Sequence, residues 1–276
     1  MGKIDHMDKF FKYSALGNDM IVIDPQFCTV EMSPKNIRQI CDRHFGAGAD
    51  GICYGPLPNN AADVPTMRFL NPDGSEAEKS GNGMRIFARY LWDAGYVTER
   101  NYQIGINQEV VPVRVLNEQA TEMAIGMGQL SFLWVDEEMK FGDEVVRATA
   151  VSVGNPHCVI ITDDLTPIHH LGPIIENAPQ FPNRTNVQLV KIIDEHTIQI
   201  EIWERGAGYT LASGTSSCAA AGTAVKLGHC QSPVTVQMAG GNATVEIAVD
   251  GAVNLSGSVH AVYEGYFAKD LNLFYK

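Results

Sequence analysis

The sequence predicts an α+β protein built from two similar halves. Short β-type runs recur along all 276 residues, whereas only three segments have the periodicity of a helix. Two of these helices are each preceded by a serine and a glycine, and the two serines, Ser80 and Ser213, lie 133 residues apart, close to half the chain. Ala88 and Ala221 correspond at the same offset. A repeat of this kind indicates two similar α+β halves that face each other.

The β-type runs are separated by turn residues at regular spacing, which is typical of a mostly antiparallel sheet. Ten such runs predict strands: Phe10–Tyr13, Met20–Ile23, Met67–Leu70, Val110–Val115, Ala150–Val153, Cys158–Ile161, Val187–Ile193, Thr197–Trp203, Val234–Met238 and Ala243–Val249.

Three segments predict helices. Ser216–Leu227 ends at Gly228, and Pro34–Phe45 ends in the same way at a glycine. The clearest periodicity lies in Met84–Ala94, which Gly95 terminates and whose apolar side chains recur at i, i+3, i+4, i+7 and i+8: Met84, Phe87, Ala88, Leu91 and Trp92.

Composition and charge narrow the class of protein. With 45% hydrophobic and 19% charged residues the chain is an ordinary globular sequence, which excludes collagen, low-complexity disorder and coiled coils. The net charge of −12 is not interrupted by any cluster of basic residues, so nucleic acid and anionic membranes are excluded as partners. No apolar run approaches the roughly 18 residues of a spanning helix, and no signal peptide is visible. We therefore expect a cytoplasmic protein.

The cysteines and histidines give no sign of a metal or a disulfide framework. The six cysteines form no CxxC pair and have no regular spacing, so we expect small buried side chains in a reducing compartment. The histidines, including His169 and His170, have no metal-ligand spacing. Residues 1–6 precede a second methionine, Met7, and we interpret them as a leader added for expression.

The two serine-glycine entrances predict an anion site. The first N–H groups of a helix lack intrahelical partners and carry the positive end of the dipole, and glycine lets a ligand approach them closely. Two facing entrances could hold one carboxylate and place Ser80 and Ser213 on opposite sides of the adjacent carbon, which suits an amino acid. The alternative is that both serines are simple helix N-caps, and a twofold occurrence makes it weaker.

Further polar residues cluster in turn contexts. A predicted strand ends in Glu204-Arg205 and a glycine-rich turn follows, which suits an ammonium and a carboxylate, although a solvated ion pair is the alternative. Asn18, Asn155 and Asn186 are further candidates, although asparagine often only forms turns.

These segments together resemble the diaminopimelate epimerase family, in the family's order and from Met7 to the C-terminus. The principal matches are Asn71–Glu76 leading into Ser80–Gly83, then Gly154–His157, then Glu204–Gly206 leading into Ser213–Thr215. Others are Leu16–Asp19, Arg43–Gly46, Ala49–Gly51, Arg184–Asn186 and Tyr263–Gly265.

The resemblance implies two pseudo-symmetric domains, each a curved, mostly antiparallel sheet around a central helix, with the active site in the cleft between them. We place the domains at residues 7–125 and 126–261, with 262–276 returning to the first. It also implies a cofactor-independent isomerase without pyridoxal phosphate or metal, a small amino-acid or carboxylate substrate, a role in lysine biosynthesis and a possible homodimer. Two sets of residues are implied to bind substrate: polar groups by Asn18, Asn71, Asn155, Asn186, Glu204 and Arg205, and the α-carboxylate by Gly81, Asn82, Gly214 and Thr215.

One departure from the family pattern concerns the chemistry. Ser80 and Ser213 occupy the positions of the family's two catalytic cysteines, of which one removes the α-proton and the other reprotonates the opposite face. A thiol has a pKa of about 8.5, which a helix N-terminus can lower, whereas an alcohol is far less acidic. Two-thiol racemisation is therefore not expected. Proton transfer would need another base, for which His157, Glu204 and Asp73 are the candidates, with the serines donating hydrogen bonds.

Several functions stay open at this point. The chain could be an isomerase or lyase with a non-thiol base, as the phenazine-pathway isomerases use a carboxylate and hydroxyproline dehydratases keep one thiol. It could also be a non-catalytic amino-acid-binding homologue, or a cysteine enzyme into which serines were engineered. Differences at Lys79, Tyr209 and Ser216-Ser217 favour a natural sub-branch, and those at Lys79 and Tyr209 could reshape the pocket for a different substrate.

Overall fold

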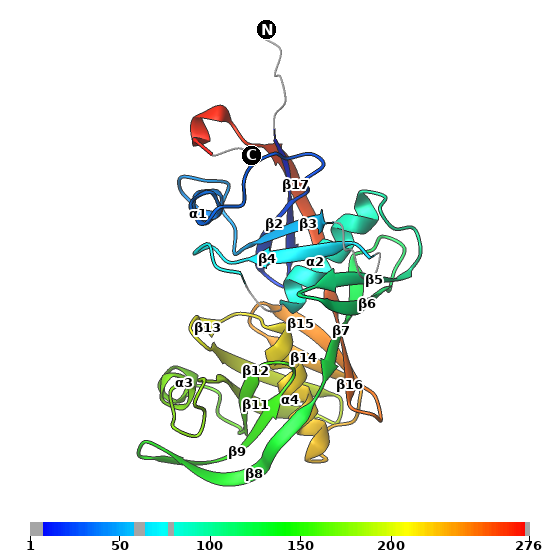
Figure 1. Ribbon diagram of the computed structural model, residues 1–276. Helices are drawn as coiled ribbons and strands as arrows, with labels where there is room; N and C mark the ends of the chain where they lie inside the picture. Colours follow the sequence, from blue (N-terminus) through cyan, green and yellow to red (C-terminus); the bar gives the residue numbers. More distant parts are fainter. Residues whose placement is uncertain (1–7, 58–63, 77–79, 274–276) are drawn as a thin grey trace. The chain divides into compact units, whose positions relative to one another are not determined.

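The computed structural model describes residues 8–57, 64–76 and 80–273. The leader predicted at residues 1–6 and the family difference at Lys79 lie outside the described residues. The chain divides into two compact units, Met1–Ile125 with Ser258–Lys276, and Gly126–Gly257. It passes from the first unit to the second within one strand and returns at the end of another. Figure 1 shows the helices and strands of each unit.

The first unit contains most of the N-terminal half and the C-terminal segment. Its helices are α1 (Pro34–Cys41) and α2 (Gly81–Asp93), followed late in the chain by the short 3-10 helix η1 (Lys269–Leu271). Its strands are β1 (Lys9–Ala15), β2 (Asn18–Ile23), β3 (Ile52–Leu57), β4 (Thr66–Leu70), β5 (Asn101–Ile106), β6 (Glu109–Val115), the first part of β7 (Glu122–Gln129) and β17 (His260–Tyr266).

The second unit has two helices, α3 (Ile168–Glu176) and α4 (Gly214–Lys226). Its strands are β8 (Ser131–Phe141), β9 (Glu144–Ser152), β10 (Pro156–Ile161), β11 (Asn186–Asp194), β12 (Thr197–Glu204), β13 (Gly208–Thr210), β14 (Val234–Met238), β15 (Gly241–Ile247) and β16 (Ala252–Ser258).

The strand pairing of the first unit recurs in the second. The antiparallel pairs β1–β17, β1–β2, β3–β4, β5–β6 and β6–β7 have the counterparts β9–β8, β9–β10, β11–β12, β14–β15 and β15–β16. The parallel pairs β2–β3 and β4–β5 match β10–β11 and β12–β14. Because a parallel pair needs a long crossover, each is bridged by a helix, α1 or α3 in the first pair and α2 or α4 in the second. The repeat predicted from the two serines is therefore a repeat of topology.

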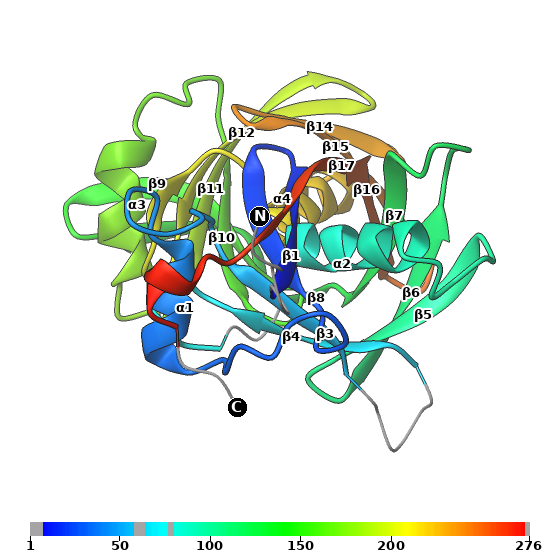
Figure 2. The same ribbon diagram turned by 90° about the horizontal axis from the view of Figure 1, so that it is seen from above.

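In each unit the sheet packs against helices on both faces. On one face of the first unit, Ile37 and Ile40 of α1 join a core with Ile21, Ile52 and Leu70. Alternate strand residues point the other way, where the Cys53 thiol lies 3.5 Å from the carbonyl oxygen of Gly83 in α2. In the second unit α3 packs in the same way, and α4 contacts β9 to β12, β14 and β15 (Figures 1 and 2). Helices on both faces explain why β2, β10 and β11 each contain an unbroken run of buried residues.

The fold class predicted from the sequence is confirmed, with differences in detail. The sheet is mostly antiparallel, as predicted, whereas the parallel pairs, α3 and the strands β3, β5, β7, β8, β13, β16 and β17 were not predicted. Helix α1 stops at Cys41 instead of Phe45, because the Asp42 carboxylate accepts the N–H groups of His44 and Phe45 at 2.8 Å and turns the chain. Two strands end before their predicted bounds: β9 ends at Ser152 instead of Val153, and β15 ends at Ile247 instead of Val249.

The return to the first unit begins at Ser258, earlier than the predicted residue 262. The reason is pairing: the Val259 N–H bonds to the Thr121 carbonyl at 2.9 Å, and β17 then runs antiparallel to β1. All six cysteines are buried and free. Within the part of the chain that the structure describes, no helix is long and apolar enough to cross a membrane.

Candidate active site

Ser80 and Ser213 are the N-caps of α2 and α4, two helices of 13 residues each. Their backbones are nearly the same, with φ −140° and ψ 113° for Ser80 and φ −144° and ψ 127° for Ser213. Each hydroxyl oxygen accepts the N–H three residues ahead, from Gly83 at 3.1 Å and from Ser216 at 3.4 Å. The N-cap alternative weighed from the sequence thus describes the local geometry of both serines, and it leaves each hydroxyl hydrogen able to point elsewhere.

The residues predicted to bind a carboxylate form the first turn of each helix. Gly81 and Asn82 open α2, and Gly214 and Thr215 open α4. The Asn82 amide is turned inward: its oxygen accepts a hydrogen bond from the buried Arg85, and its nitrogen lies 3.5 Å from the Asn18 oxygen. The helix N-termini therefore present backbone N–H groups, with the Asn82 side chain used for internal support.

Asn18 belongs to a charged network on the same unit. Its amide nitrogen donates to Asp50 at 3.0 Å, and Asp50 in turn pairs with Arg43 at 2.5 Å. Arg43 also bonds Asp19 at 2.6 Å, and the buried Lys12 ammonium contacts Asp19 as well. Burial acts to raise the pKa of Asp19, but the bonds from Arg43 and Lys12 outweigh it and lower that pKa to about 2. The network fixes Asn18 near the first turn of α2.

Asn71 and Asp73 lie in an exposed turn after β4. The Asn71 amide nitrogen donates to the Ser75 hydroxyl at 3.0 Å, and the Asp73 carboxylate accepts from both the N–H and the hydroxyl of Ser75, at 2.8 and 2.6 Å. These two bonds lower the pKa of Asp73. Asp73 is thus a solvated turn carboxylate and a weak base.

His157 is fully buried in β10 and is the centre of a polar chain. Its Nδ1 lies 3.3 Å from the Gln188 oxygen and its Nε2 lies 2.9 Å from the Asn155 oxygen. The Gln188 nitrogen donates to the Ser216 hydroxyl at 3.0 Å, next to the cap of α4. Burial, only partly offset by Gln188, lowers the pKa of His157 to about 3. The ring is therefore neutral at pH 7 and a poor proton acceptor.

Asn186 joins two other predicted site segments. Its amide nitrogen donates to the Pro156 carbonyl at 2.9 Å, and its oxygen accepts the Arg205 N–H at 2.9 Å. The Arg205 guanidinium bonds the Asn183 carbonyl at 3.2 Å. Asn186 thus holds the start of β10 to the turn after β12, and both polar ends of its side chain are used in doing so.

Glu204, the last residue of β12, lies beside the cap of α4. Burial raises its pKa, and a hydrogen bond with Ser213 offsets part of that rise. A carboxylate with a raised pKa next to a hydroxyl is a stronger base than an ordinary glutamate and a suitable proton-transfer group. The sequence suggested His157, Glu204 and Asp73 as bases. Of these, only the environment of Glu204 raises the pKa of the group and so favours a role as base.

Tyr209 faces away from this carboxylate. Its ring contacts the ring of His169 of α3 at a tilt of 39°, with centroids 4.6 Å apart, and a hydrogen bond with Glu201 raises its pKa. Two residues of the site, Gln188 and Glu176, were not singled out from the sequence. The available signal was a polar residue inside an apolar run: Gln188 stands between Val187 and Leu189, and both of its neighbours are fully buried, as it is.

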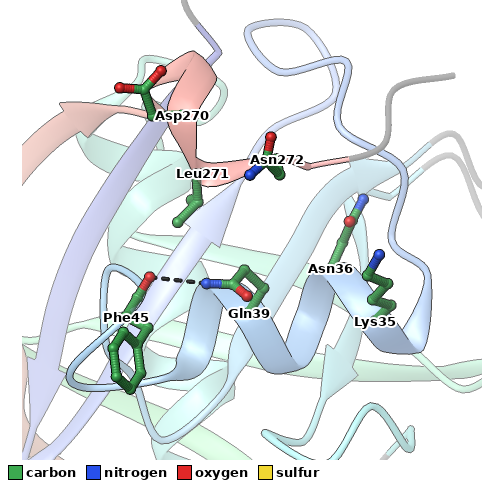
Figure 3. Close-up of a pocket in the computed structure, with 7 residues that line it drawn as sticks. All are labelled: Lys35, Asn36, Gln39, Phe45, Asp270, Leu271 and Asn272. Carbon is green, nitrogen blue, oxygen red and sulfur yellow. Dashed lines mark hydrogen bonds between the residues drawn. The ribbon is translucent and has the colours of Figure 1, made fainter.

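A cavity of about 350 Å³ lies elsewhere on the first unit, between α1 and η1. Figure 3 shows its lining, in which the Gln39 side chain donates to the Phe45 carbonyl at 2.8 Å. It contains none of the predicted site residues.

The chain is similar in sequence to proteins of one family. The model of the family described as diaminopimelate epimerase matches residues 10–133 and 149–262. Diaminopimelate epimerase 2 of Nostoc sp. is 47% identical, over 95% of this chain and 96% of its own length. Diaminopimelate epimerase of Microcystis aeruginosa is 38% identical, over 94% and 98%.

Solved structures share the fold at low sequence identity. A phenazine biosynthesis protein of the PhzF family from Bacillus anthracis has a TM-score of 0.71 at 15% identity, covering 95% of this chain and 99% of the other. A hydroxyproline epimerase from Agrobacterium vitis has a TM-score of 0.70 at 12% identity, covering 96% and 93%.

Proposed function

Because the chain belongs to the diaminopimelate epimerase family, we propose that it is a cofactor-independent isomerase that inverts the α-carbon of diaminopimelate, the compound in its relatives' names, as a step of lysine biosynthesis. The observation that carries the proposal is the equivalence of Ser80 and Ser213. Each caps the helix of an equivalent crossover, with the same backbone conformation and a glycine directly after it.

The substrate's α-carboxylate binds at these helix starts. The backbone N–H groups of Gly81, Asn82, Gly214 and Thr215 donate to it, at the positive ends of the two helix dipoles. The other polar groups of the substrate are held by Asn18, Asn71, Asn155 and Arg205. Asn186 acts on Arg205 through the backbone bond described above.

Glu204 is the proton acceptor in the second unit. The α C–H bond breaks, its proton passes to the Glu204 carboxylate, and the electron pair stays on the α-carbon, where the bound carboxylate delocalises it. The Ser213 hydroxyl orients Glu204 through their hydrogen bond. Ser80, the equivalent cap of the first unit, returns a proton to the carbanion and regains its own from solvent, and Glu204 releases the α-proton to solvent, so both groups return to their starting states. His157, neutral and buried, positions Asn155.

We also propose that the protein is cytoplasmic, forms a homodimer and binds no nucleic acid. The absence of basic clusters in a chain of net charge −12 supports the last point. Light scattering at micromolar concentration measures the oligomeric state, and a monomer mass overturns the homodimer.

Exchange of the substrate α-proton in D₂O, followed by NMR, tests the function. The panel contains L,L- and meso-diaminopimelate and, for comparison, proline, alanine and glutamate. Loss of the α-proton signal of diaminopimelate supports the proposal, and loss with another amino acid alone assigns a different substrate. Tight binding without exchange for every compound overturns it in favour of a non-catalytic binding protein.

A further inference from the structure

A single buried carboxylate holds the turn that carries Glu204 and Arg205. Glu176, the last residue of α3, is 6% exposed and accepts three hydrogen bonds. Its Oε2 accepts from the Trp203 indole at 2.8 Å, and its Oε1 accepts from the Gly206 N–H at 2.8 Å and from Arg184 at 2.9 Å. Two of its donors, Trp203 and Gly206, are the residues directly before and after the Glu204-Arg205 pair.

The packing around this carboxylate leaves its partners little freedom. A Cβ on Gly172 of α3 would lie 2.5 Å from the Trp203 ring, so the indole is pressed against the helix. Gly206 has φ +80°, a left-handed conformation that glycine adopts without strain and that turns its N–H toward Glu176. The Glu176 carbonyl also accepts the Thr185 N–H at 3.2 Å. Helix α3 therefore buttresses the end of β12.

We propose that Glu176 is a positioning residue for the reaction, which fixes the direction of the Glu204 carboxylate and of Arg205 by clamping both sides of that pair. The inference rests on the function proposed above and adds to it a residue that contacts no substrate. A buried carboxylate with three donors is held more firmly than a turn stabilised by backbone bonds alone. Displacement of a catalytic group by about 1 Å can cost a factor of roughly 100 in rate.

Glu176→Gln is the informative variant. The amide can keep an oxygen toward Gly206 and Arg184, but it then turns an NH₂ group toward the Trp203 indole N–H, so two donors face each other. Trp203→Phe removes that indole donor and with it the clash. Glu144→Gln is the matched control, because Glu144 is an exposed carboxylate that also contacts α3, through His170 at 3.0 Å.

Two readouts separate positioning from folding. The first is the indole N–H signal in ¹⁵N NMR, in which one of the signals of the three tryptophans disappears in Trp203→Phe and is thereby assigned. The second is kcat/KM for α-proton exchange, normalised to the folded fraction. We expect Glu176→Gln to shift the Trp203 signal and to lower kcat/KM roughly 10- to 100-fold, with Glu144→Gln unchanged. In the double variant, which combines Glu176→Gln with Trp203→Phe, we expect the fold-loss in kcat/KM to be smaller than the product of the fold-losses of the two single variants.

Other results overturn the inference. A Trp203 signal that stays in place in Glu176→Gln contradicts the contact, and a shifted signal with unchanged exchange per folded molecule contradicts the positioning role. If Glu176→Gln does not fold, Trp203→Phe decides alone: a loss of several-fold in normalised kcat/KM supports the role, and no loss overturns it. Failure of the unsubstituted chain to exchange any α-proton is a separate outcome that overturns the proposed function, and the positioning role falls with it.

Discussion

Ser80 and Ser213 cap two helices that hold the same place in the strand order of their units, and their φ angles differ by 4° (−140° and −144°). The side chains that surround them differ. Ser80 precedes a helix in whose first turn Asn82 accepts a hydrogen bond from Arg85, whereas the Ser213 hydroxyl is hydrogen-bonded to Glu204. The same serine N-cap thus occurs in both units, but within the residues that the structure describes only Ser213 has a titratable group, Glu204, hydrogen-bonded to it. We therefore assign the two serines different roles.

The capping function of Ser80 predicts a separation between stability and activity. Ser80→Ala removes the acceptor for the Gly83 N–H and is expected to lower the free energy of unfolding by about 1 kcal/mol. Ser80→Asn, which caps about as well as serine, is expected to lose only a few tenths of a kcal/mol. Both lack the hydroxyl and lose exchange activity. Urea unfolding and α-proton exchange check this, and full activity in Ser80→Asn would contradict the role of the hydroxyl.

The raised pKa of Glu204 predicts how activity depends on pH. As a base it must be ionised, so kcat/KM falls on the acid side with a midpoint above the ordinary glutamate pKa of about 4.3. Glu204→Gln removes that limb and lowers exchange by about 10²- to 10⁴-fold. A pH profile of the unsubstituted chain and of the variant measures both effects. An acid limb that persists unchanged in the variant's residual activity belongs to another group.

The raised pKa of Glu204 also makes the free energy of unfolding depend on pH. Between the unfolded pKa and the raised folded pKa, the folded chain binds more protons at Glu204 than the unfolded chain does, so its contribution to stability is lost as pH rises through this window. Glu204→Gln is therefore expected to be relatively more stable than the unsubstituted chain above the window than below it. Unfolding free energies at several pH values test the sign, and an opposite trend would refute the burial argument.

For His157 we expect the opposite dependence of stability on pH. Its folded pKa of about 3 lies below the ordinary value of about 6.5, so the unfolded chain binds the extra proton between these values. The stability due to the buried neutral ring is present above about pH 6.5 and is lost as pH falls toward 3. NMR of labelled histidine should find no titration of His157 between pH 5 and 8. A midpoint near 6.5 would show that the ring is hydrated.

The Asn186 side chain makes two hydrogen bonds, to Pro156 and to Arg205, and one substitution is expected to remove both. Asn186→Ala leaves the Pro156 carbonyl and the Arg205 N–H without their bonds, at a cost of about 1–3 kcal/mol for each group that stays buried. Asn186→Asp keeps an acceptor for Arg205 but turns a buried carboxylate oxygen toward the Pro156 carbonyl oxygen, so at neutral pH its loss is expected to be at least as large. Thermal unfolding of both variants gives the order, and equal stability of all three proteins would contradict the two contacts.

The sequence located three helices and ten strands, but not the parallel pairs, α3 or the strands β3, β5, β7, β8, β13, β16 and β17. Strand alternation and helix periodicity are local signals, and they found α1, α2 and α4 near their observed bounds. Helix α3 has nine residues with Gly172 and Pro173 in its interior, both of which weaken a helical pattern, so tertiary packing against β11 and β12 decides its conformation. Which strands run parallel depends on crossovers, which single-strand patterns do not encode.

For the site, the order of the motifs located the groups at the turns but not what supports them. Ser80, Ser213, Glu204 and Arg205 are recognisable because glycines flank them. Gln188 lies inside β11 and Glu176 ends the unpredicted helix, so each contacts the site only after the strands and helices have packed. The neutrality of His157 and the raised pKa of Glu204 likewise depend on burial, which linear spacing cannot supply.

Proton transfer is assigned to the two helix caps, to Glu204 beside Ser213 in the second unit and to Ser80 itself in the first. The most direct measurement compares α-proton exchange of diaminopimelate in D₂O by the unsubstituted chain, by Ser80→Cys and Ser213→Cys singly, and by the double variant. Because thiols are far more acidic than alcohols, the double variant is predicted to exchange at least about 100-fold faster, with neither single variant reaching that rate. A double variant no faster than the unsubstituted chain, with its fold intact, would contradict the account.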